Sequence, residues 1–417
     1  MSEVGTEQVV ERPSWRERLT ATTWWPLFLH TLPAYVLSRL CVLAGAAVVA
    51  AELRVDANIA EERGLPLTDP HSTQNTGSAV RPILEVLLSW DGKWYMDIVR
   101  SGYPRTIPAD VTYFMNEARA AFFPLFPMLG RAADVVLPGG DSLAVLVMNN
   151  VLGLVAIVLF AVLAHRLYGE RVARRTATLS ALFPGSFVLS FAYSEALMVV
   201  LAAACLLMLI DHEWTAAGVF AALATATRPN GLALVLACGV AAWFAVRDRR
   251  DWSALVSVAL APIGFVVFQI WLGQHTGEAG AWFRVQREAW DEGASFGLTA
   301  IRNSVEAIWQ PMTSPTDTIT ALSFAATIAL LIMSWKARLP WVLTVYSWAI
   351  VLLMLAPATV TARPRFLFTA FPLIIGAVRW YDDRSEHDET VWPLTLAACG
   401  AGLAALTGLY GVFGAIP

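Results

Sequence analysis

The sequence has little charge and almost no lysine. Only 15% of its 417 residues are charged and 57% are hydrophobic, and its two lysines are Lys93 and Lys336. This composition lies outside that of soluble globular domains. The net charge of -4 also lacks the basic excess of nucleic-acid-binding proteins, so we expect no nucleic-acid partner. The composition predicts an all-α polytopic membrane protein.

Motifs of several soluble enzyme classes are absent. The four cysteines lie singly in apolar segments without a CxxC pair, and the six histidines show no paired spacing, so a histidine or cysteine metal site is not expected. No glycine-rich phosphate loop follows a strand pattern, which excludes an ordinary nucleotide-binding domain. We therefore expect no cofactor and no metal, with a carboxylate-bound divalent ion as the open alternative.

What the chain does have is a series of apolar segments of about 20 residues, the length of a membrane span. They predict a single transmembrane domain at residues 24–417 with about 11 transmembrane helices, after a cytoplasmic tail at residues 1–23. Arginine-rich, lysine-poor usage favours a bacterial source. The predicted spans are 25–51, 142–164, 176–191, 196–210, 214–227, 232–246, 254–272, 316–334, 340–357, 366–380 and 391–413.

Two polar stretches, 52–141 and 273–315, are predicted external loops. Inside the first, the apolar pieces 83–99 and 121–137 are interrupted by charged residues or prolines, so we expect interfacial helices there. In the second loop, 282–290 reads as another amphipathic helix. Residues 52–80 receive no role.

Basic residues flank the spans unevenly. With the tail in the cytoplasm, the clusters at 166–175, 247–250, 336–338 and 379–384 all lie inside, as the positive-inside rule requires. Counting 121–137 as a span would break this agreement. The same alternation places the external loops and three short turns on one outer face. We therefore predict a multi-pass protein of the cell membrane, with its active site on the external face.

The outer face would gather charged side chains that are costly at a membrane. Two carboxylates and several cations suit a phosphate-bearing substrate and a hydroxyl that must lose its proton, because arginine binds phosphate oxygens and a carboxylate accepts protons. These charged residues are Asp91, Glu195, Lys93, Arg228, Arg363 and Arg365.

Five short motifs carry a family resemblance. The chain resembles the PIG-V mannosyltransferases, which add the second mannose in GPI-anchor synthesis, and their bacterial relatives, all within the membrane-embedded GT-C glycosyltransferases. The extended stretch before residue 80 and the lysine at position 93 are less typical of that family. The motifs are Ser89–Tyr95 with Ser101–Tyr103, Ala121–Pro127, Tyr193–Glu195, Arg228–Gly231 and Pro364–Phe366.

The resemblance implies an enzyme that transfers mannose from polyprenyl-phosphate-mannose to a hydroxyl of a lipid-linked or glycolipid acceptor, with inversion. It implies Asp91 as the general base. Another polyprenyl-phospho-sugar, such as one of arabinose or glucose, is the alternative donor. The implied donor-phosphate ligands are Arg365, Arg363, Arg228 and Lys93, and the implied substrate-binding residues are Glu195, Tyr193, Asn230 and Trp94.

Most of these residues also have a structural explanation. Asp91 could cap the helix that follows it, and Lys93 could pair with Asp97 at helical spacing. Glu195 could interact with a helix dipole, and Arg228 could extend to lipid phosphates.

The aromatic side chains also have a structural explanation, because tryptophan and tyrosine often anchor helices at the membrane interface. Trp90, Trp94 and Tyr95 fit that role.

At the level of function, a lipid transporter and a GT-C fold that only binds lipid stay as alternatives, since both would be polytopic and carry charges in the membrane. The absence of internal repeats and the clustering of charges at one surface favour the enzyme.

Overall fold

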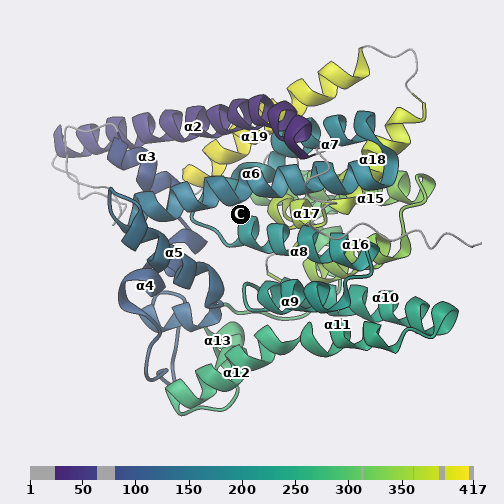
Figure 1. The fold of residues 1–417 in the computed structure, drawn as a ribbon. Coiled ribbons are helices and arrows are strands. Elements are labelled where there is room, and N and C mark those ends of the chain that lie inside the picture. Colours follow the sequence, from purple (N-terminus) through teal and green to yellow (C-terminus); the bar gives the residue numbers. More distant parts are fainter. Residues whose placement is uncertain (1–23, 63–79, 311–313, 360, 385–389, 413–417) are drawn as a thin grey trace, which may run out of the picture.

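The computed structural model is a bundle of helices. It describes residues 24–62, 80–310, 314–359, 361–384 and 390–412, and in these ranges the only β-pairing is an isolated bridge between Ala294 and Pro357. Most helices run along one common direction, and α2 packs beside α19 along one side (Figure 1). The predicted all-α architecture is confirmed. The predicted cytoplasmic tail lies outside the described residues.

The bounds of the helices are as follows. The first half contains α2 (Trp24–Glu62), α3 (Val80–Leu87), α4 (Asp91–Ser101), η1 (Asn116–Ala121), α5 (Leu125–Val136), α6 (Asp141–Tyr168), α7 (Glu170–Leu182), η2 (Pro184–Leu189), α8 (Glu195–Ile210) and α9 (Trp214–Thr225). The second half contains η3 (Pro229–Leu232), α10 (Ala233–Arg249), η4 (Trp252–Ala254), α11 (Leu255–Leu260), α12 (Ile263–Thr276), α13 (Ala281–Glu288), α14 (Leu298–Trp309), α15 (Pro315–Lys336), α16 (Trp341–Leu355), α17 (Pro364–Thr369), α18 (Pro372–Asp382) and α19 (Val391–Gly411).

Six helical segments in the described part are long and apolar enough to cross a membrane, which confirms a multi-pass membrane protein. Three further apolar helices, α8, α9 and α16, are shorter. The count of 11 spans stays a prediction. The six segments are Trp24–Val55, Asp141–Tyr168, Pro229–Arg249, Trp252–Thr276, Pro315–Lys336 and Val391–Gly411.

Several predicted helices are interrupted in the structure. The predicted helix at 83–99 is two helices, α3 and α4, because Trp90 between them has a φ of 55° that no α-helix contains. The predicted spans 176–191 and 366–380 break at Pro184 and Pro372, where η2 and α18 begin, since proline lacks the N–H that a continuing helix needs. The predicted amphipathic helix 282–290 is α13.

Ion pairs mark the end of the bundle opposite Glu195. At the C-terminal end of α8, Asp211 pairs with Arg166 of α6 at 2.6 Å, and Arg175 of α7 pairs with Asp382 of α18 at 2.6 Å. The 16 residues of α8 separate this end from Glu195 by about 24 Å. The basic clusters therefore lie far from the turn that carries Glu195.

Inside the bundle, Arg39 on α2 is a buried cation that the sequence did not single out. Its guanidinium donates to the carbonyl oxygen of Ser186 at 2.9 Å and to Ser190 Oγ at 3.1 Å. A buried charge is tolerated when hydrogen bonds replace its water. Arg39 thus fastens α2 to η2, the short helix that leads into the turn at Tyr193–Glu195.

Helix η2 in turn packs closely against the start of α17. A Cβ atom at Gly185 would lie 2.1 Å from the carbonyl oxygen of Pro364, a distance at which atoms cannot coexist. Only glycine therefore permits this approach. Because Pro364 directly precedes Arg365, this contact fixes the position of the Arg365 backbone.

We predict that Gly185→Ala forces α17 away from η2 and destabilises the protein by about 1–3 kcal/mol. The thermal midpoint of the purified protein in detergent should fall. The matched control is Gly408→Ala on α19, where an added Cβ meets nothing within 4 Å. Equal midpoints for the two variants would contradict this role of Gly185.

Candidate active site

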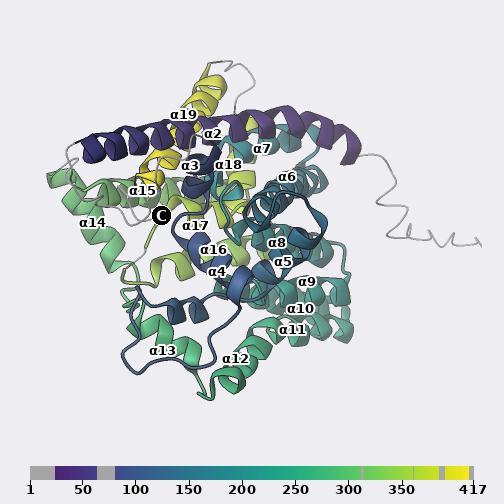
Figure 2. The same ribbon diagram turned by 90° about the vertical axis from the view of Figure 1, so that its left-hand side faces the viewer.

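Asp91 and Arg365 form the central ion pair of the candidate site. Asp91 Oδ2 lies 2.6 Å from Arg365 Nη1, although the two residues are 274 positions apart in the chain. Asp91 is the first residue of α4 and Arg365 the second residue of α17. Figure 2 views the bundle from the end that carries α3, α4 and α5.

A second carboxylate and a second guanidinium extend this pair. Glu195 Oε1 lies 3.7 Å from Arg365 Nη1, and Glu195 Oε2 lies 2.8 Å from Arg228 Nη1. The exposed fractions of the side chains are 13% for Asp91, 7% for Arg365, 12% for Arg228 and 0% for Glu195. We call these four residues the ionic cluster. Its two negative and two positive charges cancel, which makes its burial tolerable.

The backbone around Asp91 is strained. Trp90 occupies the N-cap position of α4 with φ 55° and ψ -121°, a combination that costs a residue other than glycine free energy. Its indole nitrogen donates to the carbonyl oxygen of Tyr410 at 2.9 Å, which holds the turn against α19. The expectation that Asp91 itself caps the helix is wrong, because Asp91 is already inside α4 and its carboxylate faces Arg365.

Local structure also sets the other charged residues. Glu195 is the first residue of α8, where the positive end of the helix dipole favours a carboxylate. Arg228 is the extended N-cap of η3, and Pro229 starts that short helix. The expectation that Arg228 extends to lipid phosphates is wrong, because its side chain is mostly buried and pairs with Glu195.

Arg363 lies outside the ionic cluster. It is buried, and its Nη1 donates to the carbonyl oxygen of Thr316 at 3.1 Å and to the hydroxyl of Thr320. Both partners belong to α15. The preceding residue, Ala362, has a φ of 48°. Arg363 therefore ties the segment before α17 to α15, while Arg365, two residues later in the first turn of α17, reaches Asp91.

Two predicted substrate-binding residues, Tyr193 and Trp94, are buried. The Arg365 guanidinium carbon lies 5.5 Å from the centre of the Tyr193 ring, so Tyr193 adjoins the ionic cluster. Trp94 packs edge-on against Tyr113 and Trp290, with ring centres 5.6 and 6.0 Å apart. The interfacial-anchor expectation is wrong for Trp94, which has almost no exposed surface.

Lys93 and Asn230 lie outside the ionic cluster. The Lys93 side chain is exposed, with its ammonium 5.0 Å from the centre of the Trp94 ring. Among the residues that the structure describes, Lys93 makes no ion pair with Asp97, which contradicts that expectation. Asn230 is half-buried on η3, and in the described part of the chain it makes no hydrogen bond to the ionic cluster.

Sequence reasoning missed Ser194 and misjudged Tyr95. Tyr95 is buried, not an interfacial anchor, and its hydroxyl lies 2.5 Å from Ser194 Oγ. Ser194 Oγ also accepts a hydrogen bond from Arg228 Nη1 at 3.1 Å. The available signal was the Tyr-Ser-Glu motif, in which only the first and last residues were given roles.

The second predicted external loop covers the aromatic residues beside the cluster. Trp282 of α13 donates to the carbonyl oxygen of Ala121 at 2.9 Å, and Arg284 donates to that of Pro108 at 2.9 Å. Arg284 also pairs with Glu278 at 2.6 Å, and this hydrogen bond lowers the pKa of Glu278 below its ordinary value. α13 is thereby fixed onto the first loop.

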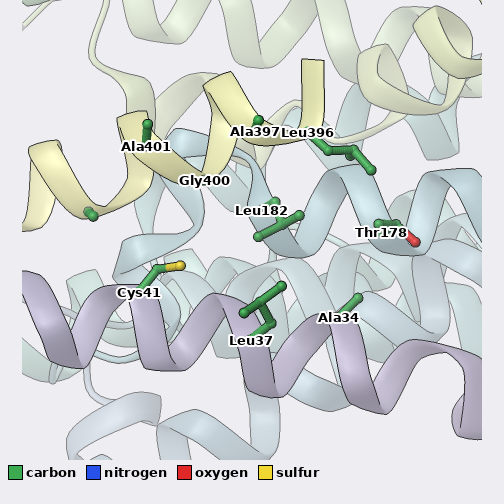
Figure 3. Close-up of a pocket in the computed structure, with 10 residues that line it drawn as sticks. Ala34, Leu37, Cys41, Thr178, Leu182, Leu396, Ala397, Gly400 and Ala401 are labelled. Atoms are coloured by element: carbon green, nitrogen blue, oxygen red, sulfur yellow. The ribbon is translucent and has the colours of Figure 1, made fainter. Parts of the chain in front are cut away.

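An apolar groove lies away from the ionic cluster. The groove, of about 570 Å³, runs between α2, α7 and α19, with Leu37, Leu182 and Leu396 among its lining residues (Figure 3). It contains no residue of the ionic cluster.

Within the described ranges, no group of three histidine, cysteine or acidic side chains gathers in a way that could hold a metal ion. The ionic cluster itself offers carboxylates and guanidiniums.

This arrangement can pair an anion with a base. Arg365 engages Asp91 through Nη1, while its buried Nε has no hydrogen-bond partner among the described residues. A guanidinium in that state can donate further hydrogen bonds to phosphate oxygens. Asp91 is the more exposed of the two carboxylates, so an entering hydroxyl can reach it.

Comparison with solved structures finds distant likenesses. The crystal structure of ArnT from Cupriavidus metallidurans bound to undecaprenyl phosphate has 15% identity and a TM-score of 0.48, over 75% of this chain and 57% of that one. The Archaeoglobus fulgidus oligosaccharyltransferase in complex with Zn and sulfate has 16% identity and a TM-score of 0.46, over 88% and 53%. The chain thus spans little more than half the length of these proteins.

Sequence comparison gives the family. No curated protein sequence matches the chain. A family model described as mannosyltransferase (PIG-V) matches residues 35–246, half of the chain, including Asp91, Glu195 and Arg228. Arg365 lies beyond the matched region. The predicted membership is confirmed, and the chain belongs to the PIG-V mannosyltransferase family.

Proposed function

We propose that this protein is a GT-C-type glycosyltransferase that moves mannose from polyprenyl-phosphate-mannose to a hydroxyl of a lipid-linked acceptor. The observation that carries the proposal is the contact of Asp91 with Arg365, at 2.6 Å, in a membrane protein of the mannosyltransferase family. A base and a phosphate ligand then stand side by side. The reaction needs both groups at one place.

In the proposed reaction, the acceptor hydroxyl attacks the anomeric carbon of the donor and gives its proton to Asp91. The bond between that carbon and the phosphate oxygen breaks, and the oxygen keeps the electron pair. Arg365 and Arg228 stabilise the negative charge that develops on the phosphate. Attack from the side opposite the leaving group inverts the anomeric centre.

The choice of Asp91 as the base rests on access. Of the two carboxylates in the ionic cluster, Asp91 is partly exposed and Glu195 is fully enclosed. A general base must come within hydrogen-bond distance of the hydroxyl. We therefore assign the proton to Asp91, and we assign Glu195 to holding the two arginines.

Donor binding would also change the state of Asp91. In the unliganded arrangement, Asp91 Oδ2 is occupied by Arg365 Nη1 at 2.6 Å. A donor phosphate competes for the same guanidinium. As Arg365 turns toward the phosphate, the Asp91 carboxylate is freed to accept the hydroxyl proton when the sugar is in place.

The remaining assignments follow the family and the charge pattern. We place Lys93 beside the donor phosphate, and Tyr193 and Asn230 beside the sugar or acceptor, whereas Arg363 and Trp94 hold the surrounding helices. We place the ionic cluster on the external face of the cell membrane, because the basic clusters, represented by Arg166 of α6, lie at the opposite end of α8. The acceptor is a glycolipid or another lipid-linked hydroxyl.

We predict that Asp91→Asn lowers the transfer of radiolabelled mannose from polyprenyl-phosphate-mannose to total membrane lipid by at least about a hundredfold. Asparagine keeps the shape of the side chain but cannot accept the proton. The matched control is Asp97→Asn, on the same helix and outside the cluster. Equal transfer by wild type and Asp91→Asn would remove the base assignment, and lipid movement across liposomes without transfer would favour a transporter.

We predict that Arg365→Lys lowers kcat/KM by roughly ten- to a hundredfold. Lysine keeps the charge but loses the planar fork that spans two oxygens. Arg302→Lys serves as the control, because Arg302 lies exposed on α14 and, among the described residues, pairs with Glu306 on the same helix. A wild-type kcat/KM for Arg365→Lys would show that a point charge suffices.

We predict that transfer does not require a divalent metal, because the guanidiniums supply the positive charge at the phosphate. Activity measured after exhaustive chelation should equal that of the untreated protein. A loss that manganese or magnesium restores would contradict the prediction. Chelation followed by zinc addition tests the same point for a softer ion.

A further inference from the structure

Ser194 occupies the N-cap position of α8 without capping it. A serine at this position normally accepts a hydrogen bond from a backbone N–H two or three residues later, but Ser194 makes no such bond. Its hydroxyl instead lies 2.5 Å from Tyr95 Oη and accepts from Arg228 Nη1 at 3.1 Å. The usual structural reason for a serine here therefore does not apply.

Tyr95 holds the other side of this contact. It lies one turn after Asp91 on α4, so the two side chains share a helix face. Its ring is buried edge-on between Phe122 and Phe126, with centres 4.9 Å apart in both cases. These contacts and the burial of the ring restrict the movement of the Tyr95 hydroxyl.

Arg228 is the residue that this contact serves. Its Nη1 lies between Ser194 Oγ at 3.1 Å and Glu195 Oε2 at 2.8 Å. Both anchors use one nitrogen, and among the described residues the other guanidinium nitrogens make no hydrogen bond. Contacts at one end of this planar group restrict its rotation and leave its other two nitrogens for a ligand.

We propose that Tyr95 and Ser194 are positioning residues that orient the Arg228 guanidinium toward the phosphate of the lipid-linked donor. Neither residue touches the substrate. Tyr95 fixes Ser194, and Ser194 together with Glu195 fixes Arg228. The proposal rests on the proposed function, which gives Arg228 its phosphate.

The first test is Tyr95→Phe, which removes the hydroxyl and keeps the ring. We expect the KM for the donor and the dissociation constant of polyprenyl phosphate to rise about tenfold, while the KM for the acceptor stays constant. The control is Tyr103→Phe, because Tyr103 is also a partly enclosed ring that contacts Phe268 and donates to the carbonyl oxygen of Phe122 at 2.6 Å. That variant should bind polyprenyl phosphate as wild type does.

A double-mutant cycle separates positioning from general stability. If Tyr95 acts through Arg228, adding Tyr95→Phe to Arg228→Lys should cost no further polyprenyl-phosphate affinity. Multiplicative losses, or an unchanged dissociation constant in Tyr95→Phe or in Arg228→Lys, would overturn the proposal. Ser194→Ala should reproduce Tyr95→Phe, and Ser194→Thr should restore binding because it returns the hydroxyl. If Tyr95→Phe lowers the thermal midpoint of the protein, the comparison of Ser194→Ala with Ser194→Thr tests the proposal in its place.

These outcomes also separate the proposal from the proposed function. The cycle measures the dissociation constant of polyprenyl phosphate without turnover, so its result can be interpreted whether or not the protein transfers sugar. Transfer that survives Asp91→Asn would remove the catalytic assignment and leave the binding cycle intact. Multiplicative losses of polyprenyl-phosphate affinity in the cycle, with transfer abolished by Asp91→Asn, would remove only the positioning role.

Discussion

The contact between Asp91 and Arg365 is the interaction on which the rest of the site depends. It joins α4 to α17 across 274 residues of sequence, at the end of a bundle whose surroundings are largely apolar. Either charge alone would be costly to bury, and removing one partner strands the other. The fold has to bring both ends together with the accuracy of a hydrogen bond.

Backbone features that are unfavourable in isolation supply that accuracy. The strained turn at Trp90 directs Asp91 inward from the first residue of α4. On the other side, the absence of a side chain at Gly185 lets η2 approach Pro364, one residue before Arg365. Strain of this kind persists only where the surrounding packing over-determines it, and here the packing of α19 against Trp90 and of η2 against α17 does so.

The sequence was sufficient to bring the right turns together but not to pair their side chains. Alternating spans return every second turn to the same face, so the convergence of Asp91, Glu195, Arg228 and Arg365 followed from hydropathy and basic flanks. Side-chain direction follows from packing between distant helices, which no local pattern contains. Arg363 illustrates the limit, because it stands two residues from Arg365 yet bonds to α15.

The neutrality of the ionic cluster explains how it can serve a charged substrate. With two carboxylates facing two guanidiniums, the four charges of the ionic cluster balance, so in the proposed reaction donor phosphate has to displace an existing partner. Glu195 is enclosed and touches both arginines, so it stays as their counter-ion. In the proposed reaction, Asp91 is the partner that donor phosphate displaces from Arg365, and this displacement frees its carboxylate for the acceptor hydroxyl.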